Sequence, residues 1–215
     1  MSSLSLITKY SELDDFENQK KHVGKIKNSI RNLTDILNDF LSASKLEEGR
    51  VENRPEAMNI RLFIADIISE MQGILIGKQV LAQEHTGNET VFLDPKILKN
   101  ILFNLVSNAI KFSNEEGRIE LTTLVDATTV EIAVKDNGIG ISKEDQESLF
   151  ERFFRGSNAV HIQGTGLGLS IVARYVELMN GTIKIDSTQN EGTTVTLKIL
   201  HTDTNTNNNE KNTTD

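Results

Sequence analysis

The sequence reads Asp-Asn-Gly-Ile-Gly-Ile at residues 136–141 and Gly-Thr-Gly-Leu-Gly-Leu at residues 164–169. An alternating, strand-like pattern precedes the first stretch, and an apolar, helix-like pattern follows the second. Glycine lets a backbone approach a ligand closely, and the N–H groups at the start of a helix attract phosphate. Either stretch alone is a common turn, but the two together predict a nucleotide-binding site.

A polar stripe on the helix upstream of these stretches supports this prediction. Asn104, Asn108 and Lys111 follow one another at i, i+4 and i+7 in an otherwise apolar segment. Residues at this spacing share one face of a helix. Either asparagine alone could simply hydrogen-bond within the core. Three such side chains on one stripe are costly to bury without a ligand, so we expect the stripe to face the nucleotide.

The composition excludes several classes of protein. The chain has 215 residues, a formal net charge of -8 and no cysteine. An acidic chain without a basic patch argues against nucleic acid as the main partner. The absence of cysteine excludes disulfides and thiolate metal sites and suits the reducing cytosol. The apolar runs are too short for a membrane helix, so we expect no membrane contact by this chain and a cytoplasmic location, even if a longer parent protein is membrane-anchored.

The N-terminal region, residues 1–50, reads as a helical hairpin. A long helix is expected over residues 17–48, after a short companion helix that contains Leu4, Leu6 and Ile7. In the long helix, apolar residues recur in steps of three and four, a pattern that we call the seam: Val23, Ile26, Ile30, Leu33, Leu37 and Phe40. Self-association into a dimeric four-helix bundle would bury it. The alternative is that the helix folds back on its own domain.

Residues 51–200 read as a second domain, and residues 201–215 as a disordered polar tail. Strands are expected at residues 57–59, 80–83, 90–93, 118–125, 128–135, 182–186 and 193–200. Helices are expected at residues 60–75, from 95 through the polar stripe, at 142–150 and at 167–179, with Asn59, Asp94 and Ser142 as N-caps. This order predicts an α+β fold, with a layer of helices on one face of a mixed sheet.

The residue types suggest which part of a nucleotide each group contacts. A carboxylate on a glycine turn can accept the adenine amino group, so Asp136 is expected to read the base while Gly138 and Gly140 let the chain pass close to it. Phe112 can stack on the purine, and Ile141 can line its slot.

The phosphates need backbone amides and a cation. Gly164, Gly166 and Gly168 lead into a helix that starts near Leu167, and Lys111 adds a charge. Magnesium prefers oxygen ligands and retains waters, so one amide oxygen from Asn108 is a suitable ligand, with Asn104 orienting it.

The order of these motifs resembles the ATP-binding catalytic domain of bacterial sensor histidine kinases. Residues 104–112 look like the N box of that family, residues 136–141 its G1 box, residues 151–155 (Glu-Arg-Phe-Phe-Arg) its F box and residues 164–169 its G2 box. Residues 191–194 (Glu-Gly-Thr-Thr) are similar to its last glycine/threonine box. The resemblance implies the two-layer α/β sandwich shared with gyrase-type, mismatch-repair and heat-shock chaperone ATPases, and a flexible ATP lid between Phe153 and Gly164.

The resemblance also implies site residues and an activity. Arg155 matches the F-box arginine near the γ-phosphate, and Thr194 would reach a phosphate or a bridging water. The implied nucleotide-binding set is completed by the other G2-box residues: Thr165, Leu167 and Leu169. The implied reaction is phosphoryl transfer from Mg-ATP to a histidine, and then to an aspartate on a response-regulator receiver domain.

One departure from the family affects the mechanism. The family's phosphoacceptor box, a His-Glu-Phe-Arg-Thr-Pro-Leu-like sequence on the first bundle helix, is missing, and residues 1–7 resemble the segment that comes directly after that box. None of His22, His85, His161 and His201 lies in such a box. We therefore expect this chain to bind ATP without phosphorylating itself.

Two alternatives remain open at this point. One is a non-enzymatic ATP-binding dimerisation module that regulates a complete kinase. The other is an ATPase of the gyrase and chaperone type, or a serine kinase that opposes sigma factors. The long seam helix and the F box argue against this second alternative.

Overall fold

The computed structural model describes residues 3–12, 15–159, 161–162 and 164–201. The chain divides into two compact units, Met1–Ser44 and Lys45–Asp215. Most of the predicted polar tail, residues 202–215, lies outside the described residues. Within the described part, no helix combines the length and the apolar character that crossing a membrane would require.

The first unit consists of helices. They are α1 (Ser3–Glu12) and α2 (Phe16–Glu47), and α2 extends three residues beyond the unit boundary. The predicted hairpin helices are therefore both present. Tyr10 on α1 stacks on His22 of α2, with the ring centroids 5.6 Å apart. The first two seam residues of α2 are partly exposed, and the last four are strongly exposed: Ile30 59%, Leu33 66%, Leu37 56% and Phe40 60%.

The second unit is built on a five-stranded sheet with the order β2-β4-β5-β7-β6. Its strands are β2 (Val80–Gly87), β4 (Arg118–Val125), β5 (Thr129–Asp136), β6 (Thr182–Thr188) and β7 (Gly192–Leu200). The β2–β4 pair is parallel and the other pairs are antiparallel. A separate antiparallel pair joins β1 (Glu56–Asn59) to β3 (Thr90–Leu93). The predicted strands are all present, with β2 four residues longer than expected.

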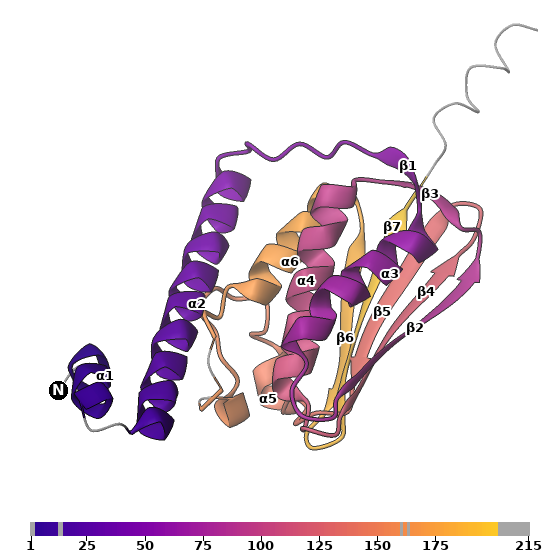
Figure 1. Ribbon diagram of the computed structural model, residues 1–215. Coiled ribbons are helices and arrows are strands. Elements are labelled where there is room, and N and C mark those ends of the chain that lie inside the picture. The colour runs from indigo at the N-terminus through magenta and orange to yellow at the C-terminus, as the bar shows by residue number, and fades with distance from the viewer. Residues whose placement is uncertain (1–2, 13–14, 160, 163, 202–215) are drawn as a thin grey trace, which may run out of the picture. The chain divides into compact units, whose positions relative to one another are not determined.

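Helices cover one face of the sheet. Figure 1 shows α3 (Ile60–Met71), α4 (Pro95–Phe112) and α6 (Gly168–Leu178) lying side by side against it. Alternate residues of β4 and β5 are buried beneath them, as expected for strands with one solvent-facing side. The apolar face of α4 is almost fully buried: Ile97, Leu98, Ile101, Leu102, Leu105, Val106, Ala109 and Ile110. The α+β fold is confirmed.

Local sequence signals fix the start of two helices. The Asn59 side chain accepts from Leu62 N at 2.9 Å, and Asp94 Oδ1 accepts from Lys96 N at 2.9 Å, with Pro95 in the first turn. The second oxygen of Asp94 accepts from Arg54 N at 2.8 Å. Asp94 thus joins the incoming connector to the helix that carries the polar stripe.

Three predicted boundaries are wrong. The helix α3 ends at Met71 and continues as a 3-10 turn, η1 (Gln72–Ile74). The helix α5 spans only Lys143–Gln146 instead of 142–150, and turns follow it; the Gln146 side chain donates to the carbonyls of Ile141 and Ser187. His201 belongs to the domain and not to a tail, because its side chain is buried and its N–H donates to Thr128 O at 2.9 Å.

Candidate nucleotide-binding site

The polar stripe of α4 meets the start of α6. A Cβ added to Gly168 would lie 2.9 Å from Asn104 Oδ1 and 3.8 Å from Asn108 Nδ2, and one added to Gly164 would lie 2.8 Å from Lys111 Nζ. Asn104 Nδ2 donates to Asn100 O at 3.0 Å, which leaves its Oδ1 directed toward Gly168. The structure therefore brings the stripe and the G2 glycines together, although 60 residues separate Asn104 from Gly164.

The phosphate end of the site is a helix start without a side-chain cap. Leu167 is the N-cap residue of α6 and makes no side-chain capping bond. The Thr165 hydroxyl accepts from Leu167 N at 3.1 Å, one residue before the helix. The first N–H groups of α6 have no intrahelical acceptor, so they form a positive end suited to phosphate oxygens.

The base end of the site is built around a buried carboxylate. Asp136 lies at the end of β5, is 8% exposed and accepts from Gly138 N at 2.8 Å through Oδ1. Burial raises the pKa of Asp136, while hydrogen bonds from the backbone N–H groups of Gly138 and Thr193 oppose the shift. A buried, acceptor-only carboxylate of this kind fits the expected contact with an adenine amino group.

Two glycines of the G1 box are required by their surroundings. A Cβ on Gly138 would lie 2.2 Å from Phe112 O, so this turn packs directly on the end of α4. Gly140 has a φ of +58°, and a Cβ there would lie 1.9 Å from Thr188 O. We call Gly138–Ile141 the base loop; its first glycine packs on the end of α4, and its second packs on the end of β6. Phe112 is half-buried at this junction, with Lys111 Nζ 5.5 Å from its ring centroid.

The expected contact through Thr194 is wrong, because the strand register places it on the other face of the sheet. Asp136 pairs with Thr193 on β7, whereas Thr194 pairs with exposed Lys135. Successive side chains of a strand point to opposite faces, so Thr193 shares the face of Asp136 and Thr194 does not. The sequence does not reveal this register, which places Thr193 and not Thr194 on the face of Asp136.

Sequence reasoning also missed Ser187, which lies at the end of β6 opposite Thr193. Its hydroxyl oxygen accepts from Ile141 N at 2.9 Å, lies 2.8 Å from Thr193 Oγ1 and donates to Gly192 O at 2.9 Å. This hydroxyl links the base loop to the two strands behind it. No local pattern in the sequence signals such a long-range contact.

Arg155 contacts the backbone of the segment that follows it. Its guanidinium donates to Ala159 O at 2.9 Å and to Ile162 O, so it is folded onto its own segment. That segment includes the one-turn helix η2 (Ser157–Ala159). The other residues of the predicted lid include two positions, 160 and 163, outside the described residues.

The residues fit a magnesium ion held mainly by a nucleotide. Asn108 is half-buried beside the α6 start, where its amide could supply one oxygen ligand. Among the described residues, no cluster of three or more histidine, cysteine, aspartate or glutamate side chains could hold a metal by itself. A single amide ligand, with phosphate oxygens and waters completing the shell, suits magnesium.

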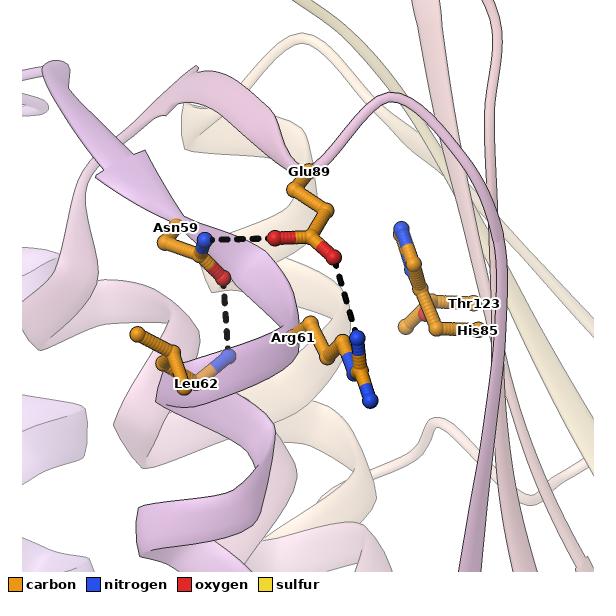
Figure 2. Close-up of polar contacts among 6 residues, drawn as sticks. All are labelled: Asn59, Arg61, Leu62, His85, Glu89 and Thr123. Atoms are coloured by element: carbon orange, nitrogen blue, oxygen red, sulfur yellow. Dashed lines mark hydrogen bonds and ion pairs between the residues drawn. The ribbon is translucent and has the colours of Figure 1, made fainter.

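A second polar cluster lies elsewhere in the domain, next to a hollow of about 490 Å³ lined by Arg61, Gln83, His85, Gly87 and Glu89. Figure 2 shows Glu89 between the side chains of Asn59 and Arg61, with His85 beside them. The pairs Asn59–Glu89 (2.9 Å) and Arg61–Glu89 (3.1 Å) are exposed, and His85 Nδ1 lies 2.7 Å from Thr123 Oγ1. The strand pattern of the sequence leaves His85 in a loop, but the residue lies on β2. The cluster extends the N-cap of α3 and is separate from the nucleotide residues.

The fold and the site together define an ATP-binding α/β sandwich domain. The sequence model for the histidine kinase-, DNA gyrase B- and HSP90-like ATPase matches residues 93–203, slightly more than half of the chain. This chain therefore belongs to that ATPase family, and its domain is of the kind found in the sensor histidine kinases of two-component systems.

The relatives give the same result. The virulence sensor protein BvgS of Bordetella bronchiseptica is 35% identical over 195 residues, which cover 86% of this chain and 16% of BvgS. The sensor protein GacS of Pseudomonas syringae is 36% identical over 192 residues, covering 84% of this chain and 21% of GacS. The solved structure of full-length ShkA in complex with AMPPNP has a TM-score of 0.73 at 25% identity, covering 86% of this chain and 39% of ShkA. The chain thus spans a minor part of the length of these relatives.

Proposed function

We propose that this chain is the catalytic core of a sensor histidine kinase, which transfers the γ-phosphoryl group of Mg-ATP to a histidine. The phosphoryl group then passes to an aspartate on a response-regulator receiver domain. The observation that carries the proposal is the convergence of Asn104, Asn108 and Lys111 on the glycines at the start of α6. Such a site works mainly by positioning the nucleotide and neutralising its charge.

Each part of the site has a defined role in this proposal. Asp136 accepts the adenine amino group, and Phe112 and Ile141 line the base. The N–H groups of the G2 box at residues 164–169 bind the phosphates, and Lys111 adds a positive charge. Asn108 holds the magnesium ion, which supplies charge neutralisation when bound. Arg155 reaches the γ-phosphate only after it releases the carbonyls of Ala159 and Ile162.

The acceptor histidine is supplied from outside the described residues of this chain. His22 is stacked on Tyr10, and the ring of His85, on β2, lies against the Thr123 hydroxyl of β4. His201 is buried near the end of β7, and His161 lies on the segment after η2. Phosphoryl transfer requires an in-line approach of the nucleophile, and none of these four lies in a phosphoacceptor box. The chain binds ATP but does not phosphorylate itself.

Dimerisation through the seam is part of the proposal. The exposed apolar side chains of α2 between Ile30 and Phe40 favour a second copy of this chain as the partner that buries them. The proposed location is the cytoplasm, where ATP and a receiver domain are accessible. The exposed seam also fits a second candidate function, in which the chain binds ATP and dimerises with a complete kinase to regulate it.

Incubation with radiolabelled ATP tests the proposed reaction. We expect no acid-labile label on this chain alone, and labelling in trans when a separate helical fragment carrying a histidine box is added. Asp136→Asn should abolish the trans reaction, whereas Asp186→Asn, on the exposed edge strand β6, should leave it unchanged. ATP binding without trans labelling would favour the regulatory module. Robust label on this chain that disappears in His22→Ala would contradict the proposal.

A further inference from the structure

A second set of contacts joins the base loop to the turn that follows the F box. The base loop, Gly138–Ile141, follows Asp136, the residue proposed to read adenine, and η2 (Ser157–Ala159) belongs to the segment that Arg155 holds. Between them lies the short helix α5 (Lys143–Gln146). The side chains that make these contacts, those of Asp145, Gln146, Ser157 and Asn158, lie outside the family boxes.

The direct link is the side-chain amide of Asn158. Its Nδ2 donates to Gly140 O at 2.9 Å and lies 3.5 Å from Ile139 O. Asn158 is half-buried, and Ile139 O also accepts from Asn190 N at 2.8 Å. The amide of Asn158 therefore donates to the backbone of the loop whose glycines surround Asp136.

Asp145 fixes the same turn from the other side. The Asp145 carboxylate accepts from Ser157 N and from Ser157 Oγ, both at 2.9 Å. The hydrogen bond from Ser157 N has the larger effect and that from Ser157 Oγ the next; both lower the pKa of Asp145, so the carboxylate stays ionised at neutral pH. The neighbouring Gln146 donates to Ile141 O and to Ser187 O, each at 3.0 Å. One turn of helix thus fixes both η2 and the base loop.

We infer that Asn158 is a positioning residue that couples occupancy of the base pocket to the position of the turn that carries the Arg155 contacts. When adenine binds against Asp136, the base loop becomes less mobile. Because the Asn158 amide donates to this loop, the turn Ser157–Ala159 becomes less mobile with it. The carbonyl of Ala159 accepts from Arg155, so the position of the turn determines where the guanidinium is held before it is released toward the γ-phosphate. This inference rests on the proposed nucleotide binding. It adds a structural link between the adenine pocket at Asp136 and the segment of Arg155.

Hydrogen exchange with adenosine, which lacks phosphates, tests the coupling. In the wild type, adenosine should slow amide exchange in Ser157–Ala159. In Asn158→Ala, adenosine should still bind, but exchange in the turn should no longer respond to it. The isosteric Asn158→Asp variant keeps the shape and loses the donor, so it should behave like the alanine variant. Loss of this hydrogen bond should also weaken ATP binding by about three- to tenfold.

One further variant and a binding measurement distinguish a failure of this inference from a failure of the proposed function. Asp145→Ala should uncouple the turn as well, since it removes the second anchor, and unfolding curves of all variants should match the wild type. Adenosine protection of the turn that persists in both Asn158 variants, or that is absent in a wild type that binds adenosine, would overturn the inference. A wild type that binds neither ATP nor adenosine would overturn the proposed function itself.

Discussion

The helices α2 and α4 carry similar apolar periodicities but have opposite surroundings. The apolar face of α4 is buried under the sheet and the neighbouring helices, and its polar stripe meets the G2 glycines. The polar side of α2 faces solvent, and its seam is exposed between Ile30 and Phe40. Periodicity therefore predicts that a face needs a partner, but not where the partner comes from. The stripe that α4 leaves outside the core is polar and fits a nucleotide. The seam that α2 leaves exposed is apolar and fits another helix.

The largest effect should come from a charge placed in the α4 core. Leu102 is fully buried, so Leu102→Asp should cost about 4 kcal/mol or more of the free energy of unfolding and leave the domain largely unfolded. Leu37→Asp on the exposed seam of α2 is the matched change and should leave the unfolding of the second unit unchanged. Urea unfolding followed by circular dichroism measures both. Equal destabilisation by the two variants would show that the seam is buried within one chain.

The second-largest difference between α2 and α4 should be seen in self-association of the chain. The seam predicts a concentration-dependent mixture of monomer and dimer, and Ile30→Asp should shift it to monomer by at least about tenfold in dissociation constant. Sedimentation velocity over a range of concentrations measures this shift. Asn100→Ala on the exposed side of α4 is a control that should not alter association. A strict monomer at high concentration that Ile30→Asp does not affect would mean that the seam folds back on its own domain.

Protonation of Asp136 should have a smaller effect on adenosine affinity and on stability, and the sign of each effect follows from the direction of its pKa shift. Because burial raises its pKa, this carboxyl takes up a proton at a higher pH than an exposed aspartate does, and adenosine affinity should fall as the pH decreases through that value. Stability should change in the opposite direction. A raised pKa in the folded state contributes stability below the unfolded pKa, and this is lost as the pH rises through the folded pKa. Calorimetry and unfolding at several pH values should show both trends, and Asp136→Asn should remove both.

The smallest effect should come from the exposed cluster near α3. Arg61→Ala removes the ion pair with Glu89 and should change the free energy of unfolding by about 0–1 kcal/mol, since the pair is exposed to solvent. Nucleotide binding should be unaffected, because the cluster is separate from the site. Thermal unfolding and ATP titration of this variant check both statements. A marked loss of ATP affinity would show that the cluster communicates with the site.

The features that depend on near neighbours in the chain are the ones that the sequence predicts best. The Asp94-Pro95 start of α4 and the stripe of Asn104, Asn108 and Lys111 follow from helix geometry alone, and the structure has both. The base loop lies at the end of β5, as predicted, because strand alternation leads directly into it.

Contacts between distant segments could not be predicted in this way. The resemblance leads to Thr194, but only the pairing of β7 with β5 decides which residue shares a face with Asp136. The Gln146 side chain bonds to β6, and the Asn158 side chain donates to a carbonyl 18 residues earlier. These contacts depend on tertiary packing, which a single sequence does not display.

Calorimetric titration with Mg-ATP tests the central claim most directly. The site formed by Asp136, the stripe and the G2 glycines should give one binding event per chain, which is lost in Asp136→Asn and kept in the matched surface variant Asp186→Asn. Asn108→Ala should weaken binding in magnesium far more than in EDTA, as expected for a residue that holds the ion. No heat of binding for the wild type, or equal affinity of the wild type and Asp136→Asn, would contradict the claim that this is the nucleotide site.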